Sequence, residues 1–142
     1  MRVVAFDVGT RRTGIAVSDV TGTLARPWRT IEGPNVASAL SLIQELRADP
    51  DGLGCIVVGL PLRLDGSPTQ ATEAAKAFAA AIEGLGLPVH LQDERLTSHE
   101  ADARLAVGER DWRKRKARLD AVSAAVILQD FLDQHARSRV LE

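Results

Sequence analysis

The apolar residues near the N-terminus fall into three short segments separated by glycine-containing turns. Residues 2–8 and 14–19 are mostly apolar, whereas residues 24–31 are more polar. Segments of this kind are typical of strands, and the short turns between them favour antiparallel pairing. Pro27 lies in the third segment, and a residue without a backbone N–H is tolerated in an edge strand. We therefore expect three antiparallel strands with residues 24–31 at the edge.

Beyond this unit, the pattern alternates between helical and strand-like spacing. Helices are predicted over residues 35–47, 70–83, 98–107 and 119–134. Strands are predicted over residues 54–60 and 88–92, and the charged residues 109–118 are predicted to be a link. The whole pattern predicts an α/β fold, namely a five-stranded mixed sheet with three antiparallel N-terminal strands and helices on both faces.

Length and composition limit the class of protein. The chain has 142 residues, so residues 1–142 are expected to form a single domain. The net charge of −1 does not by itself indicate a polyanionic partner. Cys55 is the single cysteine, which excludes an internal disulfide and is typical of a reducing cytoplasm. Because no leader pattern and no apolar run of about 20 residues occurs, we expect a cytoplasmic protein without a membrane partner.

Acidic residues stand at positions where they can meet. Asp7 ends the first predicted strand, and Asp93 and Glu94 follow the fifth. The carboxyl ends of parallel strands share one edge of a sheet, where sites commonly form. Asp120 opens the last predicted helix on its apolar face, which is expected to pack on the sheet. Acids from three separate elements are therefore predicted to approach one another.

Such a group of carboxylates suits Mg²⁺ or Mn²⁺, because both ions prefer hard oxygen ligands. Two such ions held by carboxylates can activate water and stabilise the leaving oxygen in phosphodiester cleavage. A zinc site is not indicated, because the three histidines show no zinc-like spacing with each other or with the cysteine. Structural interpretations stay open for each acid: Asp7 as a turn cap, Glu94 as a solvated loop residue, and Asp120 as an acid favoured by a helix dipole.

Four blocks of sequence resemble those of the YqgF family, also called RuvX, which is described as a pre-16S rRNA nuclease and Holliday junction resolvase-like family. The blocks are Asp7–Gly14, Val58–Leu62 with Asp65-Gly66, Asp93–Thr97, and Asp120 with Ser123-Ala124 and Ile127-Leu128. The resemblance implies a ribonuclease H-like fold and a divalent-metal-dependent nuclease. It also implies that Asp7, Glu94 and Asp120 are the catalytic and metal-binding residues.

Two positions depart from the pattern of the family and its relatives. Ser123 stands where RuvC-type resolvases carry a second acid one helical turn beyond the last aspartate. Metal binding is therefore expected to rest on three acids. Arg63 stands where the family usually has asparagine, so the role of this loop in substrate choice is open.

Basic residues flank the predicted metal site and are candidates for binding phosphates. The predicted nucleic-acid contacts are Arg11, Arg12, Arg95, Trp112, Arg113, Lys114, Arg115, Lys116 and Arg118. Basic side chains attract the phosphate backbone, and an aromatic ring such as that of Trp112 can stack on a base. The alternative for residues 109–118 is a solvated charged linker.

The leading hypothesis is thus a nuclease for structured nucleic acid, with Mg²⁺ or Mn²⁺ in a two-metal site. The substrate is either an rRNA precursor, cleaved in 5′ processing of pre-16S rRNA, or branched DNA, cleaved in recombination and repair. A symmetric four-way junction would need two active sites and hence a homodimer. The alternatives are a nucleotide-binding module of the actin-like ATPase type, which the turn after Asp7 also resembles, and a non-catalytic RNA-binding module.

Overall fold

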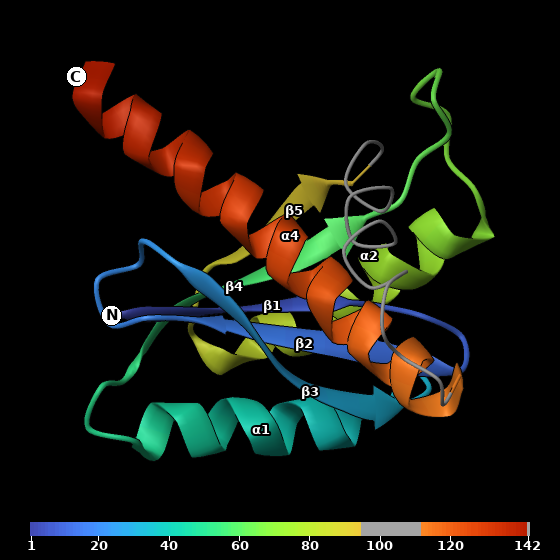
Figure 1. Ribbon diagram of the computed structural model, residues 1–142, viewed down its shortest axis with the longest axis horizontal. Helices are drawn as coiled ribbons and strands as arrows, with labels where there is room; N and C mark the ends of the chain where they lie inside the picture. Colours follow the sequence, from blue (N-terminus) through green and yellow to red (C-terminus); the bar gives the residue numbers. More distant parts are fainter. Residues whose placement is uncertain (95–111, 142) are drawn as a thin grey trace.

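The computed structural model of the protein describes residues 1–94 and 112–141, and within them a five-stranded sheet lies between helices (Figure 1). Side chains are described for residues 1–94 and 119–136. The elements in chain order are β1 (Arg2–Asp7), β2 (Arg12–Ser18), β3 (Ala25–Glu32), α1 (Val36–Ala48), β4 (Leu53–Leu60), α2 (Gln70–Ile82), the 3₁₀ helix η1 (Glu83–Leu85), β5 (Val89–Asp93) and α4 (Trp112–Leu141).

The sheet has the strand order β3-β2-β1-β4-β5, with β1 in the centre. β1 pairs with β2, and β2 with β3, in antiparallel fashion. β1 pairs with β4, and β4 with β5, in parallel. The predicted mixed sheet with three antiparallel N-terminal strands is therefore confirmed, and β3, which carries Pro27, is the predicted edge strand.

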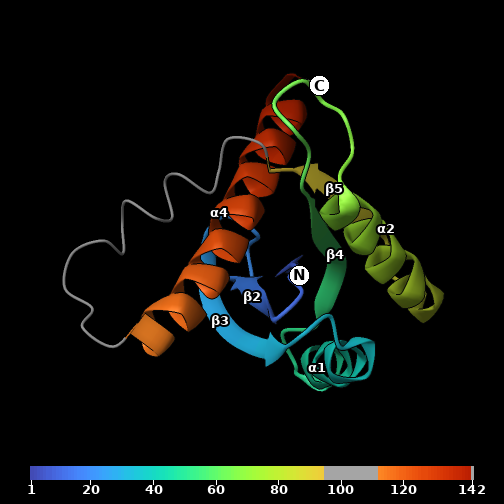
Figure 2. The ribbon, with the colours of Figure 1, turned by 90° about the vertical axis from the view of Figure 1, so that its right-hand side faces the viewer.

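Alternating side chains of the central strand, β1, contribute to two hydrophobic cores, one on each face of the sheet. Val4 and Phe6 point to the side of the sheet covered by α1 and α2, where the Phe6 and Phe78 rings lie 5.4 Å apart. Val3 and Ala5 point to the other side, which α4 covers. A strand that is buried on both faces has a continuous run of apolar residues, and residues 3–6 form such a run. Figure 2 shows α1 and α2 on one side of the sheet and α4 on the other, so the expected two-sided cover is confirmed.

Small residues bring α4 close to the sheet. Ala5 and Ala16 on the strands face Ala124 and Ala125 on α4, and larger side chains such as Ile127 complete this core. Short side chains on both partners let the helix axis approach the strands. Across the described part of the chain, none of the helices has the length and the apolar composition needed to cross a bilayer.

The last helix begins earlier than the sequence pattern predicted. Residues 112–118, predicted as a charged link, form the first turns of α4, so Asp120 follows the start of the helix by eight residues. This segment consists of lysine, arginine, alanine and one tryptophan, without the glycine or proline that would stop a helix. The dipole interpretation of Asp120 is therefore wrong, because Asp120 is not in the first turn. The helix predicted over 98–107 lies outside the described residues.

Candidate active site

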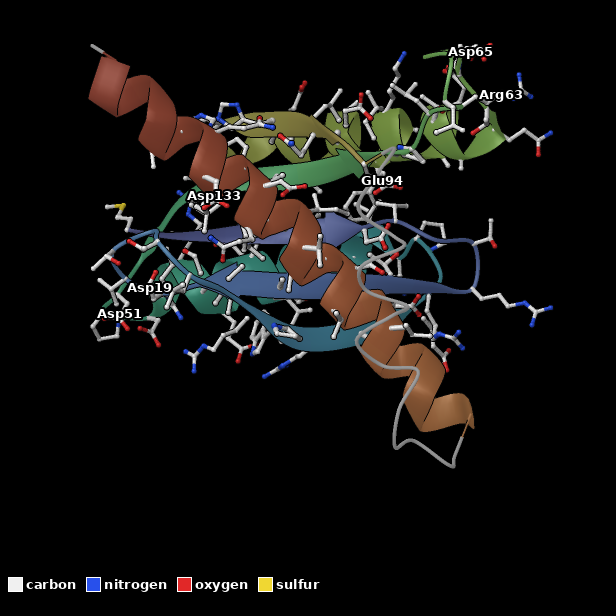
Figure 3. All side chains as sticks on the ribbon, turned by 45° about the horizontal axis from the view of Figure 1, so that its top comes forward. Asp19, Asp51, Arg63, Asp65, Glu94 and Asp133 are labelled. Carbon is white, nitrogen blue, oxygen red and sulfur yellow. The ribbon has the colours of Figure 1, made fainter. Side chains whose placement is uncertain are left out.

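The carboxyl groups of Asp7 and Glu94 meet at one edge of the sheet. Asp7 is the last residue of β1, and Glu94 follows directly after β5. The backbone N–H of Glu94 donates to the carbonyl oxygen of Leu60 at the end of β4, with 3.3 Å between N and O. The side chains of Asp7 and Glu94 are hydrogen-bonded to each other. Figure 3 shows Glu94 at the end of the sheet opposite Asp19 and Asp51.

Burial makes both carboxyl groups hold their protons unusually tightly. Burial raises the pKa of Asp7 from 3.8 to about 6; repulsion by Asp120 adds to the rise, and the hydrogen bond with Glu94 opposes it. Burial also raises the pKa of Glu94 from 4.5 to about 8, and the charge of Asp7, the bond to Asp7 and the charge of Asp93 add to this rise. Near neutral pH, protonated Glu94 therefore donates to ionised Asp7, and the pair shares one proton.

The third predicted acid, Asp120, is held by an arginine from the sheet. The Arg12 Nε–H donates to Oδ2 of Asp120 with an N–O distance of 2.7 Å, and the two side chains are 30% and 31% exposed. Asp120 lies near enough to Asp7 for its charge to raise the pKa of Asp7. The structure thus brings Asp7, Glu94 and Asp120 into one neighbourhood, with Arg12 beside them.

Two glycines make the close approach of these elements possible. A Cβ atom at Gly14 on β2 would overlap the backbone carbonyl of Asp120 on α4. A Cβ atom at Gly59 on β4 would overlap the carboxyl group of Glu94 and crowd Ile127. The prediction of site residues did not include Gly14 or Gly59, although a glycine inside a strand often marks a close approach.

The three acids offer only oxygen donors, which is the donor chemistry of a hard divalent cation, but in this structure they are not arranged around one point. Among the described residues, no group of three or more His, Cys, Asp or Glu side chains is arranged to hold a metal ion. Within the same residues, Oε2 of Glu94 is a buried oxygen that makes no hydrogen bond, while the Glu94 carboxyl group is bonded to Asp7. Carboxylate oxygens are the ligands that Mg²⁺ and Mn²⁺ prefer. The chemistry of Asp7, Glu94 and Asp120 therefore suits these ions.

The basic candidates occupy different places. Arg11 is exposed in the turn between β1 and β2, whereas Arg12 begins β2 and pairs with Asp120. Arg95 lies outside the described residues. The remaining candidates lie in the first turns of α4, with side chains outside the described part: Trp112, Arg113, Lys114, Arg115, Lys116 and Arg118. The helix that carries them leads directly to Asp120, so their contact with nucleic acid stays a prediction.

The two departures from the family pattern lie in different surroundings. Arg63 is exposed in the loop after β4, where its backbone N–H donates to the Ser67 carbonyl and its carbonyl accepts from the Gly66 N–H. Figure 3 shows Arg63 and Asp65 on this loop, beyond Glu94. Ser123 is partly buried in α4, one turn beyond Asp120. A hydroxyl therefore stands where a fourth acid would be.

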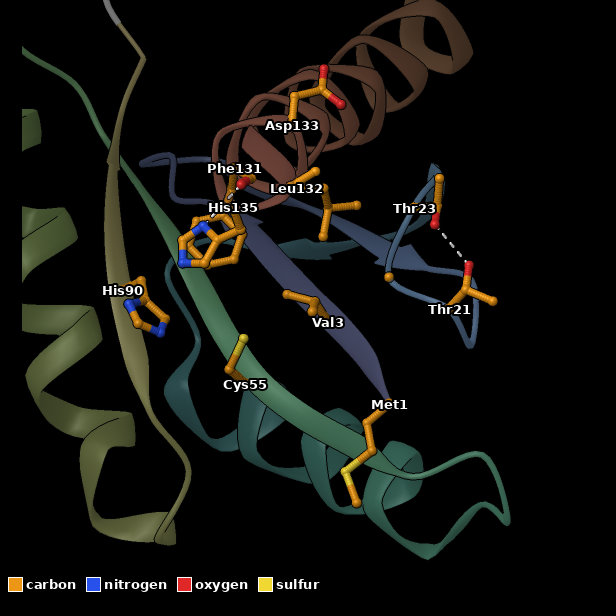
Figure 4. Close-up of a pocket in the computed structure, with 12 residues that line it drawn as sticks. Met1, Val3, Thr21, Thr23, Cys55, His90, Phe131, Leu132, Asp133 and His135 are labelled. Atoms are coloured by element: carbon orange, nitrogen blue, oxygen red, sulfur yellow. Dashed lines mark hydrogen bonds between the residues drawn. The ribbon is translucent and has the colours of Figure 1, made fainter. Parts of the chain in front are cut away.

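A hollow at the other end of the sheet brings together histidine and cysteine side chains whose spacing in the sequence did not indicate a common site. Its volume is about 530 Å³, and Cys55, His90 and His135 are among its lining residues (Figure 4). The centroids of the two imidazole rings are 5.8 Å apart, and the Phe131 ring lies 4.0 Å from that of His135. His90 on β5 thus packs against rings in the C-terminal half of α4. This hollow lies near the amino ends of the parallel strands, away from Asp7.

Replacing Glu94 with glutamine is expected to remove a pH-dependent loss of stability in the metal-free protein. Between about pH 4.5 and 8, the folded protein keeps a proton that the unfolded chain has released. The stability of the wild type therefore falls as the pH rises through this range. Denaturant unfolding in EDTA should show that the wild type and the Glu94→Gln variant are equally stable near pH 4. At pH 8 the variant should be more stable than the wild type by about 1–3 kcal/mol, a range that allows for solvent screening.

The matched control for this experiment is Glu83→Gln, because Glu83 is exposed in η1. The control should follow the pH profile of the wild type. A difference between wild type and Glu94→Gln that is the same at pH 4 and pH 8 would contradict the expected proton uptake.

The family model and the curated relatives that match this chain point to the same family. The RuvX family model, described as Holliday junction resolvase, matches residues 1–134. A protein of Koribacter versatilis named "Putative pre-16S rRNA nuclease" is 42% identical over 139 residues, which cover 97% of this chain and 90% of that protein. A protein of the same name from Moorella thermoacetica is 39% identical over 141 residues, covering 99% of this chain and 100% of that protein.

Solved structures show the same fold. RuvC of Thermus thermophilus, in complex with a Holliday junction substrate, matches with a TM-score of 0.51 and 15% identity. The match covers 89% of this chain and 91% of that one. At this level of identity the likeness concerns the fold alone. Together with the strand order β3-β2-β1-β4-β5, it confirms the ribonuclease H-like fold that the sequence resemblance implied.

Proposed function

This chain belongs to the RuvX family, and we propose that it is a divalent-metal-dependent nuclease that cleaves structured RNA in the 5′ processing of pre-16S rRNA. The observation that carries the proposal is the gathering of three acids at one edge of the sheet, namely Asp7 of β1, Glu94 directly after β5, and Asp120 of α4. The names of the curated relatives support the choice of substrate.

The acids have a stated role in this proposal. Asp7, Glu94 and Asp120 would hold one or two Mg²⁺ or Mn²⁺ ions. Such ions, when bound, lower the pKa of a coordinated water molecule toward neutrality and offset the negative charge that develops on the leaving oxygen. A bound cation would favour the ionised form of both Asp7 and Glu94, because the buried negative charges would then have a counter-charge, and the proton that the pair shares would pass to solvent.

Nearby residues would bind and orient the nucleic acid. Arg11 and the basic start of α4 flank the acids along the chain and would contact the phosphates of the substrate. Trp112 would stack on an unpaired base, a contact typical of single-stranded RNA recognition. Burial of Asp7 and Glu94 lowers the local dielectric around their carboxyl groups, which would strengthen the attraction of these two groups for a cation.

A second candidate substrate is a four-way DNA junction, which the description of the matching family model favours. A symmetric junction has two equivalent strands to cut, so this activity would require two copies of the chain. The two substrates make different demands, since an RNA end needs one active site. The oligomeric state of the active species therefore helps to separate them.

The test measures cleavage of an end-labelled pre-16S rRNA fragment and of a labelled four-way junction. We expect cleavage of the RNA with Mg²⁺ or Mn²⁺, none in EDTA, and recovery when the ion is restored. Cleavage of the junction alone, by a dimer, would favour the second candidate. Binding of RNA without cleavage in any divalent ion would instead support the non-catalytic RNA-binding module, and micromolar ATP affinity would support the nucleotide-binding module.

A further inference from the structure

We propose that Arg12 is a positioning residue, whose Nε–H holds the carboxylate of Asp120 beside Asp7 so that the three acids can share a divalent ion. This inference rests on the proposed metal-dependent function. It assigns Arg12 a task other than the phosphate contact that the sequence suggested. The geometry that points to it is the bond of 2.7 Å between Nε of Arg12 and Oδ2 of Asp120.

The bond joins two elements that are far apart in the chain. Arg12 is the first residue of β2, and Asp120 lies in α4, 108 positions later. At the same crossing, Gly14 lets the backbone of α4 approach β2 at Asp120. The backbone contact places the helix, and the side-chain bond then orients the carboxylate. A charge-assisted bond of this length is about twice as strong as a neutral one.

Electrostatics explains why Asp120 needs such a partner. Asp7 and Asp120 are neighbouring acids, and two carboxylates that are both ionised repel each other. Asp120 is 31% exposed, so in the absence of a restraint its carboxylate could turn toward solvent. With Oδ2 engaged by Arg12, the second oxygen of the carboxylate is left to serve an ion. Partners of this kind orient metal ligands in proteins.

The opposite interpretation is that Arg12 competes with the ion for Asp120. Its positive charge also repels a cation, so removing the whole side chain would mix two effects of opposite sign. Two substitutions separate them. Arg12→Lys keeps the charge but has a methylene at the position of Nε. Arg12→Gln has an N–H donor at that position but no charge. Once an ion is bound, its own charge offsets the repulsion between the acids, so the donor matters more than the charge.

The experiment measures Mn²⁺ binding without nucleic acid, by calorimetry and by electron paramagnetic resonance of Mn²⁺. We expect Arg12→Lys to weaken Mn²⁺ binding by about 10-fold or more, a loss typical of a residue that orients a ligand. Arg12→Gln should stay within a few-fold of the wild type. The matched control is Arg29→Lys, because Arg29 makes an exposed ion pair with Glu45 over 3.3 Å, between β3 and α1. It should bind Mn²⁺ like the wild type.

The outcomes separate this inference from the proposed function. If the wild type binds no Mn²⁺ at millimolar concentration, both are overturned. If the wild type binds Mn²⁺ and Arg12→Lys binds equally well, the positioning role alone is overturned. Tighter binding by both Arg12 variants would show competition instead of positioning. Thermal unfolding in EDTA supplies the structural readout: a variant that only loses stability keeps the Mn²⁺ affinity of the folded protein, and that result would also overturn the inference.

Discussion

Replacing Asp7 with asparagine is expected to abolish cleavage while leaving the protein folded. Asp7 is the central acid, because it is hydrogen-bonded to Glu94 and its charge interacts with that of Asp120. An amide oxygen is a weaker ligand than a carboxylate and carries no charge to offset a divalent cation. The loss of several kcal/mol of metal-assisted stabilisation corresponds to a fall in the cleavage rate of roughly 10³-fold or more.

The same substitution should not harm the metal-free fold. Burial raises the pKa of Asp7 to about 6, so the ionised side chain opposes folding at pH 7.5. The amide removes the charge, and its oxygen can still accept from protonated Glu94. In EDTA the variant should therefore unfold at a temperature equal to or a few degrees above that of the wild type, because about 1 kcal/mol changes the midpoint by a few degrees.

The matched control is Asp51→Asn, an exposed aspartate at the opposite end of the sheet (Figure 3). It should cleave the substrate and bind Mn²⁺ like the wild type. Cleavage by Asp7→Asn within tenfold of the wild-type rate would contradict the assignment of Asp7. A variant that fails to fold would contradict the expected gain in stability, so folding is measured in the same preparations.

The sequence predicts the sheet well because its strands are marked by local features. Residues 3–6 form an unbroken apolar run, as expected for a strand between two helical layers. Pro27 marks β3 as an edge strand, and the short turns before it indicate antiparallel pairing. Asp7 and Glu94 could be placed together for the same reason: each stands at the carboxyl end of a parallel strand.

Features that depend on contacts between distant segments were not predicted. The ion pair between Arg12 and Asp120 has no local pattern, since a basic residue after a strand is equally suited to solvent or phosphate. α4 begins seven residues before the predicted start, because a run of charges is typical of a link although these particular residues favour a helix. The positions of Gly14 and Gly59 beside the acids also emerge only when helix and sheet are packed.

Replacing Gly14 with alanine is expected to displace the backbone of α4 and thereby to weaken metal binding at the candidate site. The added Cβ would overlap the carbonyl group of Asp120 and crowd the backbone nitrogen of Ala121. Backbone atoms of a helix packed on a buried strand have no rotamer that relieves such an overlap, so the helix must shift. Overpacking in a well-packed core costs about 1–3 kcal/mol, and a clash with the backbone belongs at or above the upper end of that range.

The shift should affect the acids as well as the stability. Asp120 would move away from Asp7 and Arg12, so Mn²⁺ binding should weaken together with a fall in the unfolding midpoint of several degrees. The matched control is Gly84→Ala, because a Cβ at Gly84 in η1 would meet nothing within 4 Å. That variant should keep the wild-type midpoint and Mn²⁺ affinity. A Gly14→Ala protein with wild-type values for both would show that α4 does not press on β2 at Asp120, and the placement of this acid would then be wrong.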